Sequence, residues 1–177
     1  MEYINNSTKE LTSHAELVKR LNASIPQGQK AGAWWPVYPA EAPEPESGEI
    51  VEAAEPVKVD GKWQYGWTVR AKTSAELQQD AMAIQARLTG ALNDHLNAVA
   101  TQRSYDDRFT CSLRAGYQGP FQEEGKAFAA WMDECNMTAY QMMAEVKAGN
   151  RSVPTEAELI AALPVIEWPA SPIPAGA

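Results

Sequence analysis

The distribution of proline constrains the fold of this chain more than any other feature of its sequence. Twelve prolines are present, and most lie in two clusters, from Pro36 to Pro56 and from Pro154 to Pro174. None occurs between Pro56 and Pro120. Because proline lacks a backbone donor and interrupts helices and central strands, this interval is where long continuous elements are expected.

From Thr73 onward, apolar residues recur every three or four positions, the period of an amphipathic helix. Thr73 and Glu76 form a capping box, so a helix is expected to begin there and to run to about Gln102. Gly90 lies inside it, where glycine costs about 1 kcal/mol relative to alanine, and so suggests close packing. The predicted buried stripe consists of Leu77, Ala81, Ile84, Leu88, Leu92, His95 or Leu96, and Val99.

A second long helix is expected after Pro120, which suits a first helical turn, and Gly149-Asn150 indicates its end. Glu156 to Leu163 is expected to form a short third helix. The segment from Tyr105 to Gly119 between the long helices is interpreted as a loop. Residues 73–168 are thus predicted to be a helical domain of two long antiparallel helices plus a short one, followed by an extended tail, 169–177. The stripe of the second helix is Phe128, Trp131, Cys135, Ala139, Met142 and Val146.

Residues 49–71 have the alternating pattern of a β-hairpin around Asp60-Gly61. A two-residue turn would place Val59 opposite Lys62 and split the apolar residues between the two faces. A three-residue loop, Asp60 to Lys62, places Val59 opposite Trp63 and gathers the apolar residues on one face, so we favour it. Ile50-Val51 is a candidate third strand.

The first 72 residues are predicted to be a small β-containing region, which makes the chain an α+β protein. Tyr3-Ile4 is β-prone, and Ser13 with Glu16 forms a capping box for a short helix. Residues 26–56 are interpreted as irregular chain. Within them, the Pro/Trp-rich segment Trp34 to Pro39 is expected to lie extended against a surface of this chain or of a partner.

The sequence offers no convincing catalytic, metal-binding or cofactor-binding set, so a non-enzymatic protein is expected. His95 is expected at the edge of a helix seam, and His14 is expected to be exposed. Cys111 and Cys135 are expected to be reduced and structural. Neighbouring carboxylates such as Glu123-Glu124 diverge on a helix, and this pair is interpreted as favourable first-turn charge.

Composition excludes two classes of partner. The formal net charge is −8, and the basic residues are scattered, which disfavours nucleic acid. No apolar run is long enough to span a membrane, and the first residues do not resemble a signal peptide. Synthesis in the cytoplasm without membrane export is therefore expected.

Several segments resemble the accessory proteins of tailed-bacteriophage tail fibres. The resemblance begins at Trp34 to Pro39 and continues through Glu55 to Trp63 and the strand Trp67-Thr68-Val69. Downstream segments share it as well: Leu92 to Ala100, Arg103 to Asp106, Pro154 to Pro164 and Glu167-Trp168-Pro169. It implies a virion tail protein described either as a fibre-assembly factor or as a minor tail component, and the family offers no active-site residues to transfer.

The expected function is therefore attachment to a phage tail-fibre or baseplate protein, as a minor virion component or as an assembly chaperone, with a homo-oligomer as a further option. Aromatic and proline side chains suit a docking segment. The alternative is a receptor-binding adhesin that contacts host saccharide through exposed tryptophans. The candidate partner-binding residues are Trp34, Trp35, Pro36, Tyr38 and Trp168.

Overall fold

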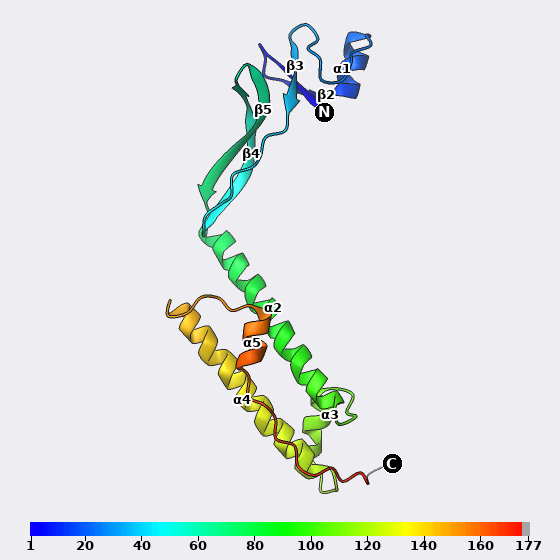
Figure 1. Ribbon diagram of the computed structural model, residues 1–177, viewed down its shortest axis with the longest axis vertical. Coiled ribbons are helices and arrows are strands. Elements are labelled where there is room, and N and C mark those ends of the chain that lie inside the picture. The colour runs from blue at the N-terminus through cyan, green and yellow to red at the C-terminus, as the bar shows by residue number, and fades with distance from the viewer. Residues whose placement is uncertain (175–177) are drawn as a thin grey trace. The chain divides into compact units, whose positions relative to one another are not determined.

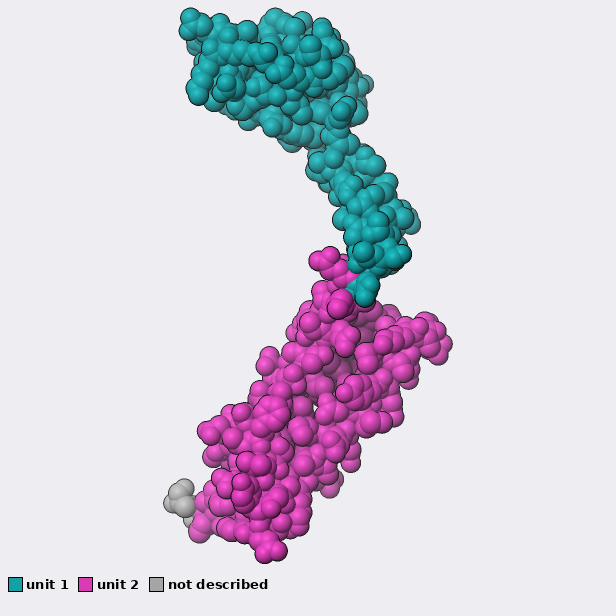
Figure 2. All heavy atoms as spheres, turned by 180° about the vertical axis from the view of Figure 1, so that it is seen from behind, with its two compact units in different colours: residues 1–78 teal, residues 79–177 magenta. Residues whose placement is uncertain are grey.

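The structure is a computed structural model that describes residues 1–174. It is an α+β protein, with the strands in the N-terminal part and the long helices in the C-terminal part (Figure 1), as the sequence predicts. The chain divides into two compact units, Met1–Gln78 and Gln79–Ala177, which Figure 2 colours separately. This division falls inside a helix, whereas the sequence places the boundary between residues 72 and 73. Residues 175–177, the end of the predicted tail, lie outside the described residues.

The N-terminal unit is built on a five-stranded sheet with the order β2-β1-β3-β5-β4. Neighbouring strands are antiparallel except β3 and β5, which are parallel. Helix α1 (His14–Leu21) follows β2 directly, and the Ser13 side chain caps it by accepting from the Glu16 amide, as predicted. The strands are β1 (Glu2–Asn5), β2 (Leu11–Ser13), β3 (Trp34–Tyr38), β4 (Glu49–Val59) and β5 (Lys62–Ala71).

Strand β3 corrects the prediction that residues 26–56 are irregular. Trp34 to Tyr38 is extended, as expected, but it forms the middle strand of the sheet between β1 and β5. Its proline content points to irregular chain, yet burying Trp34 and Val37 removes enough apolar surface from water to outweigh that tendency.

The hairpin corrects the predicted register. Asp60 and Gly61 form a two-residue turn with φ of 50° and 80°, and Val59 pairs with Lys62. Positive φ at both positions is the type I′ geometry, whose twist matches that of the strands. The assumption of a single apolar face fails, because Val57 is 49% exposed and Trp63 only 6%. Ile50 and Val51 belong to β4, which continues through a register shift between Ala54 and Val57, so they do not form a third strand.

The C-terminal unit contains the two predicted long helices, which lie antiparallel, and the predicted short one (Figure 1). Reciprocal capping boxes at Thr73–Glu76 and Thr155–Glu158 begin the first and the last of these. The predicted loop after the first long helix contains two short helices that the sequence analysis missed, although Asp107 and Thr110 form a capping box there. The helices are α2 (Ser74–Thr101), α3 (Arg108–Leu113), η1 (Arg114–Gly116), α4 (Gln122–Lys147) and α5 (Glu156–Ala162).

The core of this unit joins α2, α3, α4 and α5. Along α4 the predicted stripe is confirmed, with Phe128, Trp131, Cys135 and Met142 buried. Along α2 only the second half is buried, and Leu77, at 48% exposure, is wrongly predicted as a core residue. The buried residues are Leu92, Leu96, Val99, Ala100, Cys111, Phe128, Trp131, Cys135, Met142, Leu159 and Leu163.

Close packing occurs at a different glycine from the predicted one. A Cβ on Gly90 would meet no atom within 4 Å, so the expectation for that residue is wrong. A Cβ on Gly125 in α4 would lie 2.4 Å from the Ala115 amide nitrogen and 2.7 Å from the Arg114 carbonyl carbon. Gly125 is therefore the residue that lets η1 approach α4.

Candidate functional site

The two faces of the N-terminal sheet are covered in different ways. On one face, Tyr3 and Trp34 pack against Leu17 of α1. On the other, Ile4, Val37 and Trp63 form a second cluster. Side chains carried by the sheet and its loops cover this second cluster, and they include Trp35 and Tyr65.

Lysine side chains lie against the aromatic rings of this second face. The Lys9 ammonium lies 4.2 Å from the centroid of the Trp63 ring. The ammonium groups of Lys30 and Lys58 lie 4.2 and 4.6 Å from the centroid of Trp35. An ammonium over an aromatic ring is attracted by the ring quadrupole, and the lysine stem covers apolar surface. We call this surface the aromatic–lysine face; it consists of Trp35, Trp63, Tyr65, Lys9, Lys30 and Lys58.

A cavity of about 190 Å³ lies beside Trp35, with Lys30 and Lys62 in its lining. The loop that carries Lys30 is held by two tyrosine hydroxyls at Gly28. The Gly28 amide donates to the Tyr3 hydroxyl (2.9 Å), and the Tyr38 hydroxyl donates to the Gly28 carbonyl (3.2 Å). Ligand pockets for drug-sized molecules are usually about 300–1,000 Å³, so this preformed cavity suits a single small group.

These lysines have no carboxylate partner within the part of the chain that the structure describes. No ion pair joins Lys9, Lys30, Lys58 or Lys62 to an acidic residue among residues 1–174, although the protein has eight more acidic than basic groups. Lys19, by contrast, pairs with Glu16 on α1. The four lysines therefore present uncompensated positive charge on an acidic protein.

The predicted partner-binding residues do not form one exposed surface. Trp34 and Pro36 are buried in the N-terminal unit, and the Arg20 guanidinium lies over the Trp34 ring. Trp35 and Tyr38 are half-buried and line the cavity together. Trp168 belongs to the other unit. The lysines were not predicted, because no local pattern joins Lys9, Lys30 and Lys58, although Lys58 and Lys62 flank the hairpin turn.

Trp168 is held against the helices of the C-terminal unit. Its ring stacks on Phe128 with 5.8 Å between centroids, and the Arg103 guanidinium lies 5.2 Å from its centroid. Arg103 also donates to the Pro169 carbonyl (3.2 Å). The extended segment that follows α5 is thus anchored by packing and hydrogen bonds, which gives Trp168 a structural role.

Beneath this segment lies a buried carboxylate. Glu124 is 3% exposed; it accepts from the Tyr105 hydroxyl (2.8 Å) and from Arg103 (3.3 Å). Glu123 and Glu124 both lie in the first turn of α4, as predicted, but Glu124 is also buried, because the chain after α2 brings two donors to it. Burial, followed by the hydrogen bond to Glu124, raises the pKa of Tyr105 above its usual value.

The contacts of the two cysteines and the two histidines indicate structural roles. Cys111 and Cys135 are free and buried, as predicted, and burial raises their pKa to about 12 and about 11. His95 is half-buried at the helix seam, 5.9 Å from the Trp131 ring. His14 is also half-buried, which corrects its predicted exposure, since its Nε2 lies 2.8 Å from the Ile25 carbonyl and its ring stacks on Tyr3. Residues 1–174 contain no group of three or more metal-ligating side chains.

Comparison with known proteins gives no match: no family model, no curated protein and no solved structure is similar to this chain. Among the described helices, none is both long enough and apolar enough to cross a lipid bilayer.

Proposed function

We propose that this chain is a non-enzymatic tail protein of a tailed bacteriophage that binds the tail fibre or the baseplate. It acts there as a minor virion component or as a fibre-assembly chaperone. The proposal combines the sequence resemblance with one observation, an apolar face of the hairpin that the described chain leaves partly exposed.

This hairpin face lies on the half of β4 and β5 beyond the pairing with β3. Val51 pairs with Val69 and Ala53 pairs with Trp67, so these four side chains share one face. Trp67 is 38% and Val69 42% exposed. The opposite face carries charged side chains, and there Arg70 forms ion pairs with Glu52 and Glu76. Two-stranded ribbons are marginally stable in water, so a partner that covers the apolar face would stabilise it.

Co-expression with a tail-fibre gene of the same phage tests the proposal. The wild-type chain is expected to co-purify with the fibre protein, and Val69→Lys, which places a charge on the apolar face, is expected to reduce the yield of complex. Thr68→Lys is the matched control, because Thr68 pairs with Glu52 on the opposite face. If the wild-type chain purifies alone, fibre binding is refuted; if both variants bind equally, the hairpin face is not the contact.

Mass spectrometry of purified virions separates the two forms of the proposal, because a chaperone that departs after assembly is absent from the particle.

The adhesin alternative receives less support. Glycan stacking on Trp34 would require uncovering a buried ring, and stacking on Trp35 would displace Lys30 or Lys58. Trp168 already stacks on Phe128.

A further inference from the structure

The chain carries an acidic segment that complements the lysines of the cavity. Residues 40–48, between β3 and β4, contain Glu41, Glu44 and Glu46 with Pro43 and Pro45 between them. All five are exposed, and none of the three carboxylates forms an ion pair within residues 1–174. Within a single copy, neither the lysines of the cavity nor the glutamates of this segment therefore form an ion pair with an oppositely charged residue among residues 1–174.

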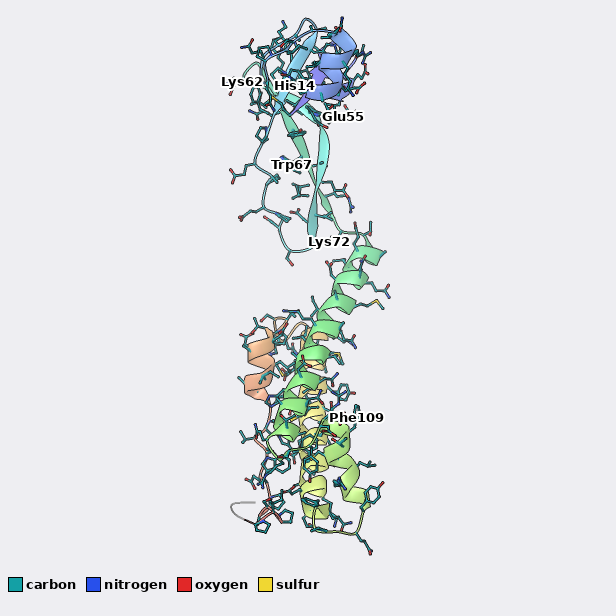
Figure 3. The ribbon with its side chains drawn as sticks, turned by 90° about the vertical axis from the view of Figure 1, so that its right-hand side faces the viewer. His14, Glu55, Lys62, Trp67, Lys72 and Phe109 are labelled. Atoms are coloured by element: carbon teal, nitrogen blue, oxygen red, sulfur yellow. The ribbon has the colours of Figure 1, made fainter. Side chains whose placement is uncertain are left out.

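None of residues 40–48 lines the cavity of its own chain. Tyr38, at the end of β3, pairs with Gln64, whereas Glu49, at the start of β4, pairs with Ala71. The segment thus bridges a stretch of β5 that is on the order of 20 Å long at about 3.3 Å per residue. The cavity lies at the turn of the hairpin, beside Gly61 and Lys62, so the segment runs from Tyr38 away from the cavity along β5. Figure 3 shows Lys62 near the turn and Lys72 at the far end of the hairpin.

We propose that the cavity between Lys30 and Lys62 is a carboxylate-binding site, and that its occupant is the Glu41–Glu46 segment of a second copy of this chain. Each copy has one site and one acidic segment, so two copies can dock reciprocally about a two-fold axis. This self-association is independent of the proposed fibre binding.

The chemistry of the site fits such an occupant. Alternating proline keeps the acidic segment extended at a low entropic cost, and aromatic-lined grooves bind proline-rich chains in this conformation. Trp35, Pro36 and Tyr38 form the apolar lining, while Lys30 and Lys62 supply the charges for a glutamate side chain. The cavity's volume of about 190 Å³ is enough for a single side chain.

Sedimentation velocity on the full chain tests the proposal by charge reversal. The measurements use about 0.15 M salt, where a Debye length of about 8 Å screens the long-range repulsion between copies of net charge −8. The site variant is K30E/K62E and the segment variant is E41K/E44K. The control is K19E/K126E, which changes net charge as the site variant does but alters lysines that pair with Glu16 and Glu123 on helix surfaces.

We expect the wild type and the control to associate as concentration rises, and each of the other two variants to associate at least about tenfold more weakly. An equimolar mixture of the site and segment variants should associate again, because reversed charges on one copy meet reversed charges on the other. Circular dichroism checks that every variant folds.

Three results would overturn the proposal. They are a wild type that stays monomeric, a site variant that associates as the control does, and a mixture that remains monomeric. A synthetic peptide of residues 40–48 provides the last arm. If this peptide quenches tryptophan fluorescence while the full chain stays monomeric, the cavity binds an acidic segment but not that of a second copy. This result would refute self-docking and assign the site to another acidic molecule.

Discussion

One substitution, glycine to alanine, is expected to have opposite effects at two positions in the helical unit. In a helix interior, alanine is favoured over glycine by about 1 kcal/mol, so this term stabilises both Gly90→Ala in α2 and Gly125→Ala in α4. At Gly90 the new methyl group meets no atom within 4 Å. We therefore expect Gly90→Ala to raise the free energy of unfolding by about 1 kcal/mol.

At Gly125 the same methyl group would meet the backbone of η1. Its Cβ would lie 2.4 Å from the Ala115 nitrogen and 2.8 Å from the Arg114 Cβ, closer than real Cβ atoms approach other atoms. Backbone cannot rotate away as a flexible side chain can, so η1 has to shift. Overpacking usually costs about 1–3 kcal/mol, and a backbone clash belongs at the upper end. After subtraction of the propensity gain, we expect a net loss of about 2 kcal/mol.

Calorimetry and far-UV circular dichroism on the full chain measure both variants. For a domain of this size, 1 kcal/mol shifts the unfolding temperature by roughly 4–8 °C, so the helical transition should rise for Gly90→Ala and fall about twice as far for Gly125→Ala. Gly66→Ala tests the same reasoning in the other unit, because its Cβ would clash with the Glu55 carbonyl oxygen, and it should lower the unfolding temperature of the sheet. Shifts of the same sign at Gly90 and Gly125 would refute the packing argument.

Three further predictions concern buried groups and the turn. Because burial raises the pKa of Cys111 to about 12 and that of Cys135 to about 11 from an ordinary 9.0, the folded state keeps protons that the unfolded state loses. The contribution of each thiol to the free energy of unfolding should be complete below pH 9 and should then decrease by about 1.4 kcal/mol per pH unit up to its folded pKa. Urea titrations at several pH values measure this decrease. A C111A/C135A variant whose free energy of unfolding decreases as steeply would contradict the prediction. Glu124→Gln should cost about 2 kcal/mol in urea unfolding through the lost charge opposite Arg103, against less than about 0.5 for exposed Glu123→Gln. Gly61→Ala should destabilise the sheet unit by about 1 kcal/mol through its positive φ, and an unchanged unfolding temperature would argue against the type I′ turn.

Most of the helical elements could be predicted because their signals are local. A capping box such as Thr73–Glu76 or Thr155–Glu158 uses residues three apart, and the observed side-chain hydrogen bonds join those same residues. The stripe of α4 was predictable for a similar reason, since residues at helical spacing share a face whatever lies opposite. The type and order of these elements therefore follow from the sequence alone.

The errors arise where distant segments decide the outcome. The hairpin register depended on which apolar residues β1 and β3 would cover, and those strands bury Trp63 but leave Val57 in solvent. Glu124 resembles Glu123 in sequence and differs only because Arg103 and Tyr105 reach it from the end of α2. The lysines of the aromatic–lysine face come from three separate parts of the chain, so no local pattern could bring them together.

The first half of α2 shows what a periodic pattern does and does not specify. Leu77 continues at helical spacing the stripe that is buried at Leu92 and Leu96, yet it is about half exposed. The period defines which side of the helix is apolar, and burial depends on whether another segment lies against that side. The same reasoning applies to Trp67 and Val69 on the hairpin, whose alternation predicts an apolar face that the described chain leaves partly in water. Residues whose pattern predicts burial but whose side chains are exposed are therefore the positions where an external partner would gain the most apolar contact, and Val69 is such a residue on the hairpin.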